Sequence, residues 1–144
     1  MIPPIVLLDR KQVMAAWGQI VEAIAPALRR EQRSSWPVLD ALIRGDFECW
    51  RIGDQGYVVS SVGYVEQTEI KACWLVFAAG EVPGGPKARV RLCQEILRWF
   101  EALARKAGCR EMRFETRRAW RHVLADYEEI GVGPMYTIYR KALR

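Results

Sequence analysis

Residues 69–106 read EIKACWLVFAAGEVPGGPKARVRLCQEILRWFEALARK, and this stretch carries the strongest fold signal in the chain. It begins with residues 69–79, whose consecutive bulky apolar side chains are typical of a strand buried on both faces. A loop of glycine and proline follows, and apolar residues then recur three and four positions apart over residues 87–106, with Gly108 as the stop signal. The stretch therefore predicts a central strand, a loop and a long helix packed on the sheet.

The N-terminal segment predicts a short strand and two helices. Residues 5–8 are apolar, and Asp9 can cap a helix whose apolar positions follow a helical spacing. Pro26 is expected to kink that helix or to end it early. Ser35 is expected to cap a second, short helix that stops at Gly45.

The remaining elements are strands and one more helix. Residues 47–52 and 57–62 flank a glycine-containing loop and predict a hairpin. Residues 110–115 alternate as a strand, a helix is expected over residues 116–130, and residues 135–139 form the last strand.

The element order is β-α-α-β-β-β-α-β-α-β, which predicts a mixed α+β fold with a central, mostly antiparallel sheet and helices on both faces. The length of 144 residues favours a single domain over residues 1–144. Apolar residues make up 51% and charged residues 27% of the chain, a balance that excludes a disordered tail, a collagen-like chain and a coiled-coil rod.

The sequence does not indicate a membrane segment, a signal peptide or a metal site. Its apolar runs fall short of the ~18–20 residues of a membrane helix, and residues 5–8 are too short for the core of a signal peptide, so we expect a cytoplasmic protein. The chain has a single histidine, His122, and its four cysteines form no Cys-x-x-Cys pair, so buried thiols are expected in place of metal ligands. The cysteines are Cys49, Cys73, Cys93 and Cys109.

The net charge of +5 is unevenly distributed. Residues 1–104 hold twelve Lys or Arg and twelve Asp or Glu, whereas residues 105–144 hold ten against five. Residues 86–121 include eleven basic and four acidic residues. Such a surplus favours an anionic partner, either a nucleotide cofactor or a nucleic acid; the alternative is a solvated helix face rich in arginine.

The loop between the buried strand and the long helix has the composition of a phosphate site. It reads EVPGGPKAR over residues 81–89. Glycines allow backbone N–H groups to approach a phosphate closely, and the N-terminus of a helix adds unpaired donors and a positive dipole end. The alternative is a plain turn with proline at the first helical position.

This strand–loop–helix and the element order resemble the GCN5-related N-acetyltransferase (GNAT) family over almost the whole chain, and in particular the small versions encoded by bacteriophages. In that family the fourth strand binds the pantetheine arm of acetyl-CoA through its backbone, and the loop wraps the pyrophosphate. The resemblance therefore implies acetyl-CoA as a co-substrate. The cofactor-binding residues that it implies are Leu75, Val76, Phe77, Gly84, Gly85, Lys87, Ala88 and Arg89.

Two loop residues depart from the family pattern. Glu81 stands in place of Arg or Gln, and a carboxylate beside a pyrophosphate is unfavourable. Pro86 stands in place of glycine or alanine and removes one N–H donor. The cations of Lys87, Arg89 and Arg91 can compensate electrostatically.

A second resemblance lies in residues 126–132, which read DYEEIGV and are similar to the family's Leu-Tyr-Glu-Lys-Leu-Gly-Phe. It implies that Tyr127 protonates the departing thiolate of CoA, a transfer typically worth ~10²–10⁴ in rate. The alternative is a half-buried aromatic that anchors a helix to the sheet. For the base that deprotonates the amine, Glu69 is the first candidate, followed by Glu115 and His122; the alternatives are strand-end charges and a surface histidine.

Three functions fit these observations. The first is an N-acyltransferase that moves an acyl group, most simply acetyl, from CoA to an amine. The second is a catalytically inactive GNAT-fold protein that binds a partner or takes part in virion assembly, in the host cytoplasm or in a phage particle. The third is a nucleic-acid-directed enzyme. The residues that would contact the nucleic acid are Arg113, Arg117, Arg118 and Arg121.

Overall fold

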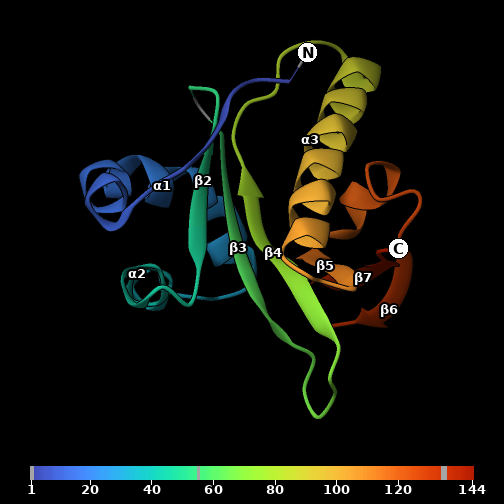
Figure 1. Ribbon diagram of the computed structural model, residues 1–144. Coiled ribbons are helices and arrows are strands. Elements are labelled where there is room, and N and C mark those ends of the chain that lie inside the picture. Colours follow the sequence, from blue (N-terminus) through green and yellow to red (C-terminus); the bar gives the residue numbers. More distant parts are fainter. Residues whose placement is uncertain (1, 55, 134–135) are drawn as a thin grey trace. The chain divides into compact units, whose positions relative to one another are not determined.

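The computed structural model describes residues 2–54, 56–133 and 136–144, and within them the chain forms a mixed α+β fold with three α-helices and seven strands (Figure 1). The elements, in chain order, are β1 (Ile5–Leu7), α1 (Arg10–Arg30), α2 (Trp36–Arg44), β2 (Glu48–Ile52), β3 (Gly56–Tyr64), β4 (Lys71–Ala79), α3 (Pro86–Lys106), β5 (Glu111–Thr116), the 3-10 helix η1 (Arg118–His122), β6 (Glu128–Val132) and β7 (Thr137–Ala142).

The strands follow the order β1-β2-β3-β4-β5-β7-β6, so the strand that contains the apolar run is the fourth of seven, as predicted. β4 and β5 run parallel, whereas the pairs β1–β2, β2–β3, β5–β7 and β6–β7 are antiparallel. The prediction of a mixed, mostly antiparallel sheet is therefore confirmed. The contacts divide the chain into two compact units, which we call the N-terminal unit (Pro3–Ser61 and Val76–Glu81) and the C-terminal unit (Val62–Leu75 and Val82–Arg144).

The N-terminal unit is built around one face of α1. Asp9 caps this helix with a reciprocal pair of hydrogen bonds to Gln12, each 2.8 Å long. The buried face then packs into a cluster with side chains of β2, β3 and β4. Its members on α1 are Val13, Ile20, Ile24 and Leu28.

Pro26 does not end α1 early, because the helix continues to Arg30, and the alternative of a kink at Pro26 stays a prediction. A proline inside a helix costs about 3 kcal/mol. Ile24 and Leu28 lie on either side of it and are 0% and 5% exposed, and each buried side chain of this size stabilises by about 1.5–3 kcal/mol. Burial of the two side chains therefore offsets the lost backbone hydrogen bond.

The second helix, α2, ends as predicted and begins with one difference. Gly45 follows its last residue in the left-handed conformation (φ 83°), which suits glycine. Ser35 precedes the helix, but its own backbone is already helical and its side chain makes no capping hydrogen bond.

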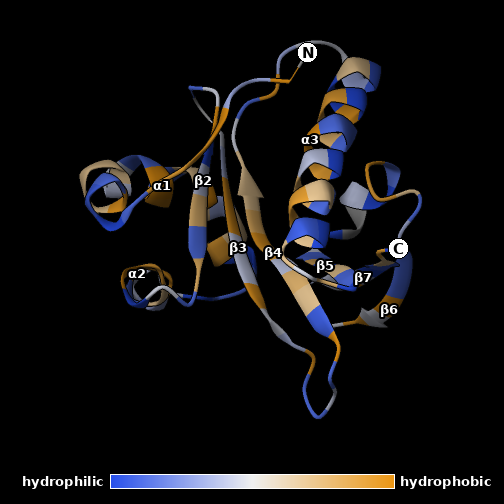
Figure 2. Ribbon diagram, viewed as in Figure 1, coloured by the Kyte–Doolittle hydropathy of each residue, from blue (hydrophilic) through white to orange (hydrophobic). Residues whose placement is uncertain are grey.

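In the C-terminal unit, helix α3 follows β4 and contacts β5. Figure 2 shows hydrophilic and hydrophobic residues alternating along α3, as expected for a helix with one buried face. Leu97, Phe100 and Ala104 form that face, and Met112 and Phe114 of β5 are also buried. The predicted helix and strand are both confirmed.

The helix predicted over residues 116–130 is wrong. Thr116 is the last residue of β5 and pairs with Thr137, and only η1 is helical. Val123, Leu124 and Tyr127 have helical spacing and are buried, but they lie in the turn that follows η1 and not in an α-helix.

Residues that the prediction assigned to the end of that helix form an edge strand instead. β6 pairs with β7 in antiparallel register, with an irregularity between Glu129 and Gly131, the glycine expected to end the helix. β7 itself runs to Ala142, beyond the predicted strand of residues 135–139, whose first residue lies outside the described part of the chain.

Candidate cofactor site

Hydrogen bonds join the loop before α3 to the first turn of the helix. Gly84 has a positive φ of 99°, and Gly85 is the residue that precedes the helix. The backbone N–H of Arg89 donates to the carbonyl of Gly85 (3.0 Å), and the Arg89 Nε donates to the carbonyl of Gly84 (2.8 Å). Arg89 therefore holds the loop in its turned conformation.

The first turn of α3 leaves backbone donors unpaired. Pro86 is the first helical residue, where a missing N–H costs little because that group has no partner within a helix anyway. The N–H groups of Lys87 and Ala88 follow, and Gly85 has no side chain with which to cap them. Such donors, together with the positive end of the helix dipole, are the groups with which helix N-termini bind anions, and their use in this protein stays a prediction.

The side chains around these donors are cationic and exposed. Residues 83–89 are all exposed, and the first turn contains no acidic residue. Among the described residues, no carboxylate lies within 4.0 Å of the ammonium of Lys87. Glu81, one of the two departures from the family pattern, is exposed and is the first residue of the loop.

The conformation of the loop depends on Gly84, and Gly84→Ala tests this. A Cβ at this position would lie 3.1 Å from the Cβ of Ala88, and the positive φ is unfavourable for alanine. We expect a loss of about 1–3 kcal/mol in the free energy of unfolding, measured by urea denaturation. Gly85→Ala is the control, because a Cβ there meets nothing within 4 Å and the φ is negative; an equal loss in both variants would contradict the argument.

The residues predicted to bind the pantetheine arm lie in the second half of β4. Leu75 and Phe77 are buried, and Val76 between them is partly exposed. The described register of β4 with β5 ends at the pair Leu75–Phe114. In the N-terminal unit, the guanidinium of Arg33 lies 5.2 Å from the centre of the Phe77 ring.

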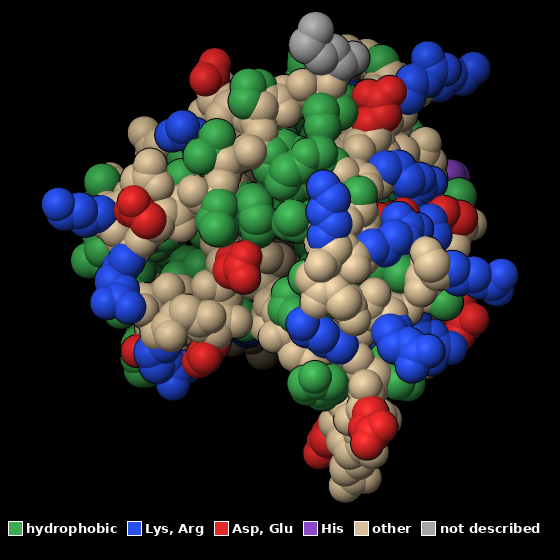
Figure 3. Space-filling model, in the orientation of Figure 1, with side chains coloured by type: hydrophobic (Ala, Val, Ile, Leu, Met, Phe, Trp, Pro, Cys, Tyr) green, Lys and Arg blue, Asp and Glu red, His purple; other side chains and the backbone are tan. Residues whose placement is uncertain are grey.

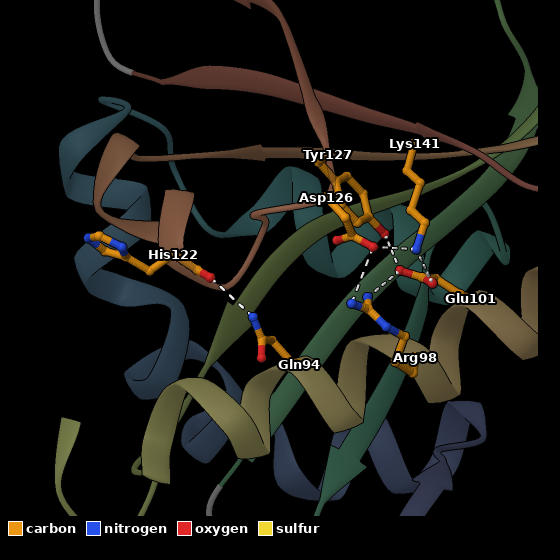
Figure 4. Close-up of polar contacts among 7 residues, drawn as sticks. All are labelled: Gln94, Arg98, Glu101, His122, Asp126, Tyr127 and Lys141. Atoms are coloured by element: carbon orange, nitrogen blue, oxygen red, sulfur yellow. Dashed lines mark hydrogen bonds and ion pairs between the residues drawn. The ribbon is translucent and has the colours of Figure 1, made fainter. Parts of the chain in front are cut away.

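Tyr127 belongs to a buried polar network that the sequence analysis did not anticipate (Figure 4). Its centre is Glu101 of α3, which is 1% exposed. Glu101 accepts hydrogen bonds from the Tyr127 hydroxyl (2.8 Å), the Lys141 Nζ (2.9 Å) and the Arg98 Nη1 (3.1 Å). Asp126 accepts from the Lys141 Nζ (2.6 Å) and pairs with the Arg98 Nη2 (3.2 Å). The network joins α3, the turn after η1 and β7.

The network keeps the Tyr127 hydroxyl protonated. Burial, and then the negative charge of Glu101, raise the pKa of Tyr127 well above its ordinary value of 10.0. Burial alone would raise the pKa of Asp126, but the hydrogen bond from Lys141 and the charge of Arg98 outweigh it and lower that pKa. The hydroxyl donates to Glu101, as expected of an aromatic anchor, and the role of Tyr127 as a catalytic acid stays a prediction.

One signal in the sequence could have revealed Glu101. It lies four residues after Leu97 and three before Ala104, on the apolar face of the predicted helix. A carboxylate on a buried helix face needs hydrogen-bond donors or cations, because an unpaired buried charge is costly. The sequence does not say which distant residues supply them.

The three candidate bases lie in different elements. Glu69 is exposed in the bend before β4, whereas the loop follows the other end of this strand. Glu115 is partly buried in β5, and the side chain of His122 is exposed while its carbonyl accepts a hydrogen bond from Gln94 (3.2 Å). Glu69 as the base stays a prediction.

The four arginines predicted to contact nucleic acid differ in their surroundings. Arg113 is paired with Glu111 (2.8 Å) and lies 5.8 Å from the centre of the Trp74 ring. Arg117 and Arg121 are exposed, and the side chain of Arg118 lies outside the described residues.

The part of the chain that the structure describes also bears on metal binding, on thiol chemistry and on membrane spans. It holds no group of three or more His, Cys, Asp or Glu side chains that could bind a metal ion. Cys49, Cys93 and Cys109 are free thiols, and burial raises the pKa of Cys49 to about 12. None of the described helices is long and apolar enough to span a membrane.

No family model matches this chain, and no curated protein matches it by sequence. Solved structures do match its fold. An aminoglycoside 6'-acetyltransferase of type Ii has a TM-score of 0.69 at 13% identity, over 98% of this chain and 97% of that one. A GNAT acetyltransferase from Streptococcus agalactiae has a TM-score of 0.63 at 16% identity, over 98% and 95%.

A third match, a GNAT acetyltransferase from Listeria monocytogenes, has a TM-score of 0.62 at 11% identity and covers 97% of this chain and 94% of that one. The fold of this chain is therefore that of the GNAT acetyltransferases. Among the similar structures, one was solved with acetyl-CoA and one with CoA and a peptide, at 11% and 12% identity.

Proposed function

We propose that this protein is an N-acyltransferase that uses acetyl-CoA and binds the pyrophosphate of the cofactor at the N-terminus of α3. The observation that carries the proposal is the turned loop at Gly84, followed by the N–H groups of Lys87 and Ala88, which have no acceptor within the helix and no side-chain cap among the described residues. A pyrophosphate needs several converging donors and positive charge, and Lys87 and Arg89 add that charge. The similarity in fold to known acetyltransferases supports the same function.

The proposal assigns the other cofactor contacts to β4. The backbone of Leu75, Val76 and Phe77 would bind the amides of the pantetheine arm, as a strand binds an added strand. Gly85 would let the pyrophosphate approach the backbone, since no side chain lies in the way.

The reaction that this arrangement would serve is direct acyl transfer. The nitrogen of a neutral amine attacks the thioester carbonyl, an N–C bond forms and the C–S bond breaks. The amine loses a proton, and the CoA thiolate accepts one. Tyr127 as the acid and Glu69 as the base are predictions. To act as the acid, the Tyr127 hydroxyl would have to give up its hydrogen bond to Glu101 and donate its proton to the thiolate.

A titration of the wild type and of Glu81→Gln with acetyl-CoA tests the proposal. We expect weak binding by the wild type and tighter binding by the variant, because a carboxylate ~5 Å from a phosphate charge costs ~3 kcal/mol at an effective dielectric of ~20 before screening. Glu66→Gln, a neutral substitution of another exposed glutamate in the turn between β3 and β4, is the control and should leave the affinity unchanged.

If neither protein binds acetyl-CoA at millimolar concentration, the acyltransferase proposal fails. The second of the three functions that fit the sequence then takes its place: a catalytically inactive protein with the GNAT fold that binds a partner or takes part in virion assembly. The exposed Glu81 and the engaged hydroxyl of Tyr127 are the two observations that favour this reading.

A further inference from the structure

The structure separates the charges of residues 86–121 into buried carboxylates and exposed cations. Of the four acidic residues, Glu101 and Glu111 are 1% and 8% exposed, Glu115 is partly buried, and only Glu95 is exposed. The basic residues of this segment are all exposed, apart from the partly buried Arg113 and from Arg118, whose side chain is not described. The surface is therefore more positive than the composition of the segment indicates.

Three of these cations form a line along α3. Arg91, Arg98 and Arg105 are seven residues apart, which is close to two helical turns, so they lie on one face at intervals of about 10 Å. Arg98 is held by Glu101 and Asp126, whereas Arg91 and Arg105 have no described carboxylate within 4.0 Å. Figure 3 shows Lys and Arg side chains gathered over this side of the molecule.

The line of arginines adjoins η1. Gln94 of α3 donates from its Nε2 to the carbonyl of His122 (3.2 Å), and His122 directly follows the exposed Arg121 in the chain. We call Arg91, Arg98, Arg105 and Arg121 the arginine surface.

We propose that the arginine surface binds the phosphodiester backbone of a nucleic acid. A duplex carries about one negative charge per 1.7 Å of its axis, and a row of arginines at fixed intervals neutralises several phosphates at once. This inference goes beyond the proposed acyl transfer and does not depend on it, because the variant that tests it changes Arg105 and Arg121 and leaves Lys87, Arg89 and Arg91 in place.

The same observations favour a nucleic acid over a lipid membrane. A helix that lies on a membrane needs exposed apolar side chains that enter the acyl region. Leu97, Phe100 and Ala104 of α3 are buried, and among the described residues of α3 and η1 no large hydrophobic side chain is exposed.

The surface is suited to the backbone and not to the bases. Trp120, which could stack on a base, is partly buried, and the centre of its ring lies 5.4 Å from the centre of the Phe114 ring. Arg113 is paired with Glu111 and half-buried. Binding should therefore depend strongly on salt and weakly on nucleotide sequence.

The test compares the salt dependence of binding in two variants that lose the same charge. Arg105→Gln with Arg121→Gln removes two cations of the surface, and Arg10→Gln with Lys11→Gln removes two exposed cations from the first turn of α1. Fluorescence anisotropy with a short DNA duplex and with an RNA duplex gives the association constant at several salt concentrations. We expect the slope of log K against log salt to become less steep by about 1.8 in the first variant on DNA, since each phosphate contact contributes about 0.9.

The α1 variant should keep the slope of the wild type. A less steep slope of log K against log salt in the arginine-surface variant alone, with either duplex, supports the proposal. The duplex that binds more tightly shows whether DNA or RNA supplies the phosphates. Equal slopes in the two variants would overturn it, as would a wild type that binds neither duplex at low salt. Binding to vesicles of anionic lipid without binding to either duplex would also overturn it in favour of a membrane surface.

Discussion

Lys87→Glu combined with Arg89→Glu is expected to abolish measurable acetyl-CoA binding. Both side chains are exposed in the first turn of α3, and their reversal places two negative charges where the proposal has two positive ones. At ~5 Å and an effective dielectric of ~20, each pair of unit charges is worth ~3 kcal/mol before screening, and about 1.4 kcal/mol is a factor of ten in affinity. The loss should exceed about 100-fold by isothermal titration calorimetry even after screening by salt.

The control for this variant is Arg10→Glu with Lys11→Glu, which makes the same change of charge in the first turn of α1. Both of its residues are exposed, and acidic residues suit the N-terminus of a helix. We expect this control to bind acetyl-CoA like the wild type and both variants to show cooperative thermal unfolding. Wild-type affinity in the α3 variant would show that the phosphates bind elsewhere.

Glu101→Ala is expected to lower the free energy of unfolding by about 3–5 kcal/mol, which is the usual effect of removing one partner of a buried ion pair. The substitution leaves the Tyr127 hydroxyl and the Lys141 ammonium without the carboxylate to which both donate. It also leaves a cavity on the buried face of α3. Urea denaturation monitored by tryptophan fluorescence measures the change.

Two substitutions separate this network from general effects on the helix. Glu95→Ala removes an exposed carboxylate from the same helix and should change the stability by less than about 0.5 kcal/mol. Tyr127→Phe removes one hydrogen bond to a charged carboxylate and keeps the ring, so we expect a loss of about 1.5–3 kcal/mol. If Glu101→Ala costs no more than Glu95→Ala, Glu101 does not hold the turn after η1 to α3.

The elements that the sequence predicted correctly are those in which the local pattern and the tertiary environment agree. α3 has apolar residues at helical spacing, and its partners bury that same face. β4 has consecutive apolar residues because it lies in the middle of the sheet. Gly45 ends α2 because a left-handed residue after a helix favours glycine.

Where the local pattern was ambiguous, contacts between distant parts of the chain decided the structure. The spacing of Val123, Leu124 and Tyr127 fits a helix that continues into the residues after them. Those residues form β6 instead, because they pair with β7 and a strand is stable only when it is paired. The sequence placed a tyrosine at position 127 and left its role open. Only the tertiary structure set Glu101, Lys141 and Arg98 around it, because their contacts span up to 40 residues of chain.

Three properties follow from the amino-acid sequence alone: the class of fold, the glycine-containing loop before α3 and the surplus of positive charge in the C-terminal part of the chain. Each of these follows from composition or from short-range spacing. Which charges face the solvent depends on how the elements pack. Glu101 and Glu111 are buried beside their cations, whereas the arginines of α3 are exposed, and this burial is a property of the packed elements that neighbouring residues in the sequence do not encode.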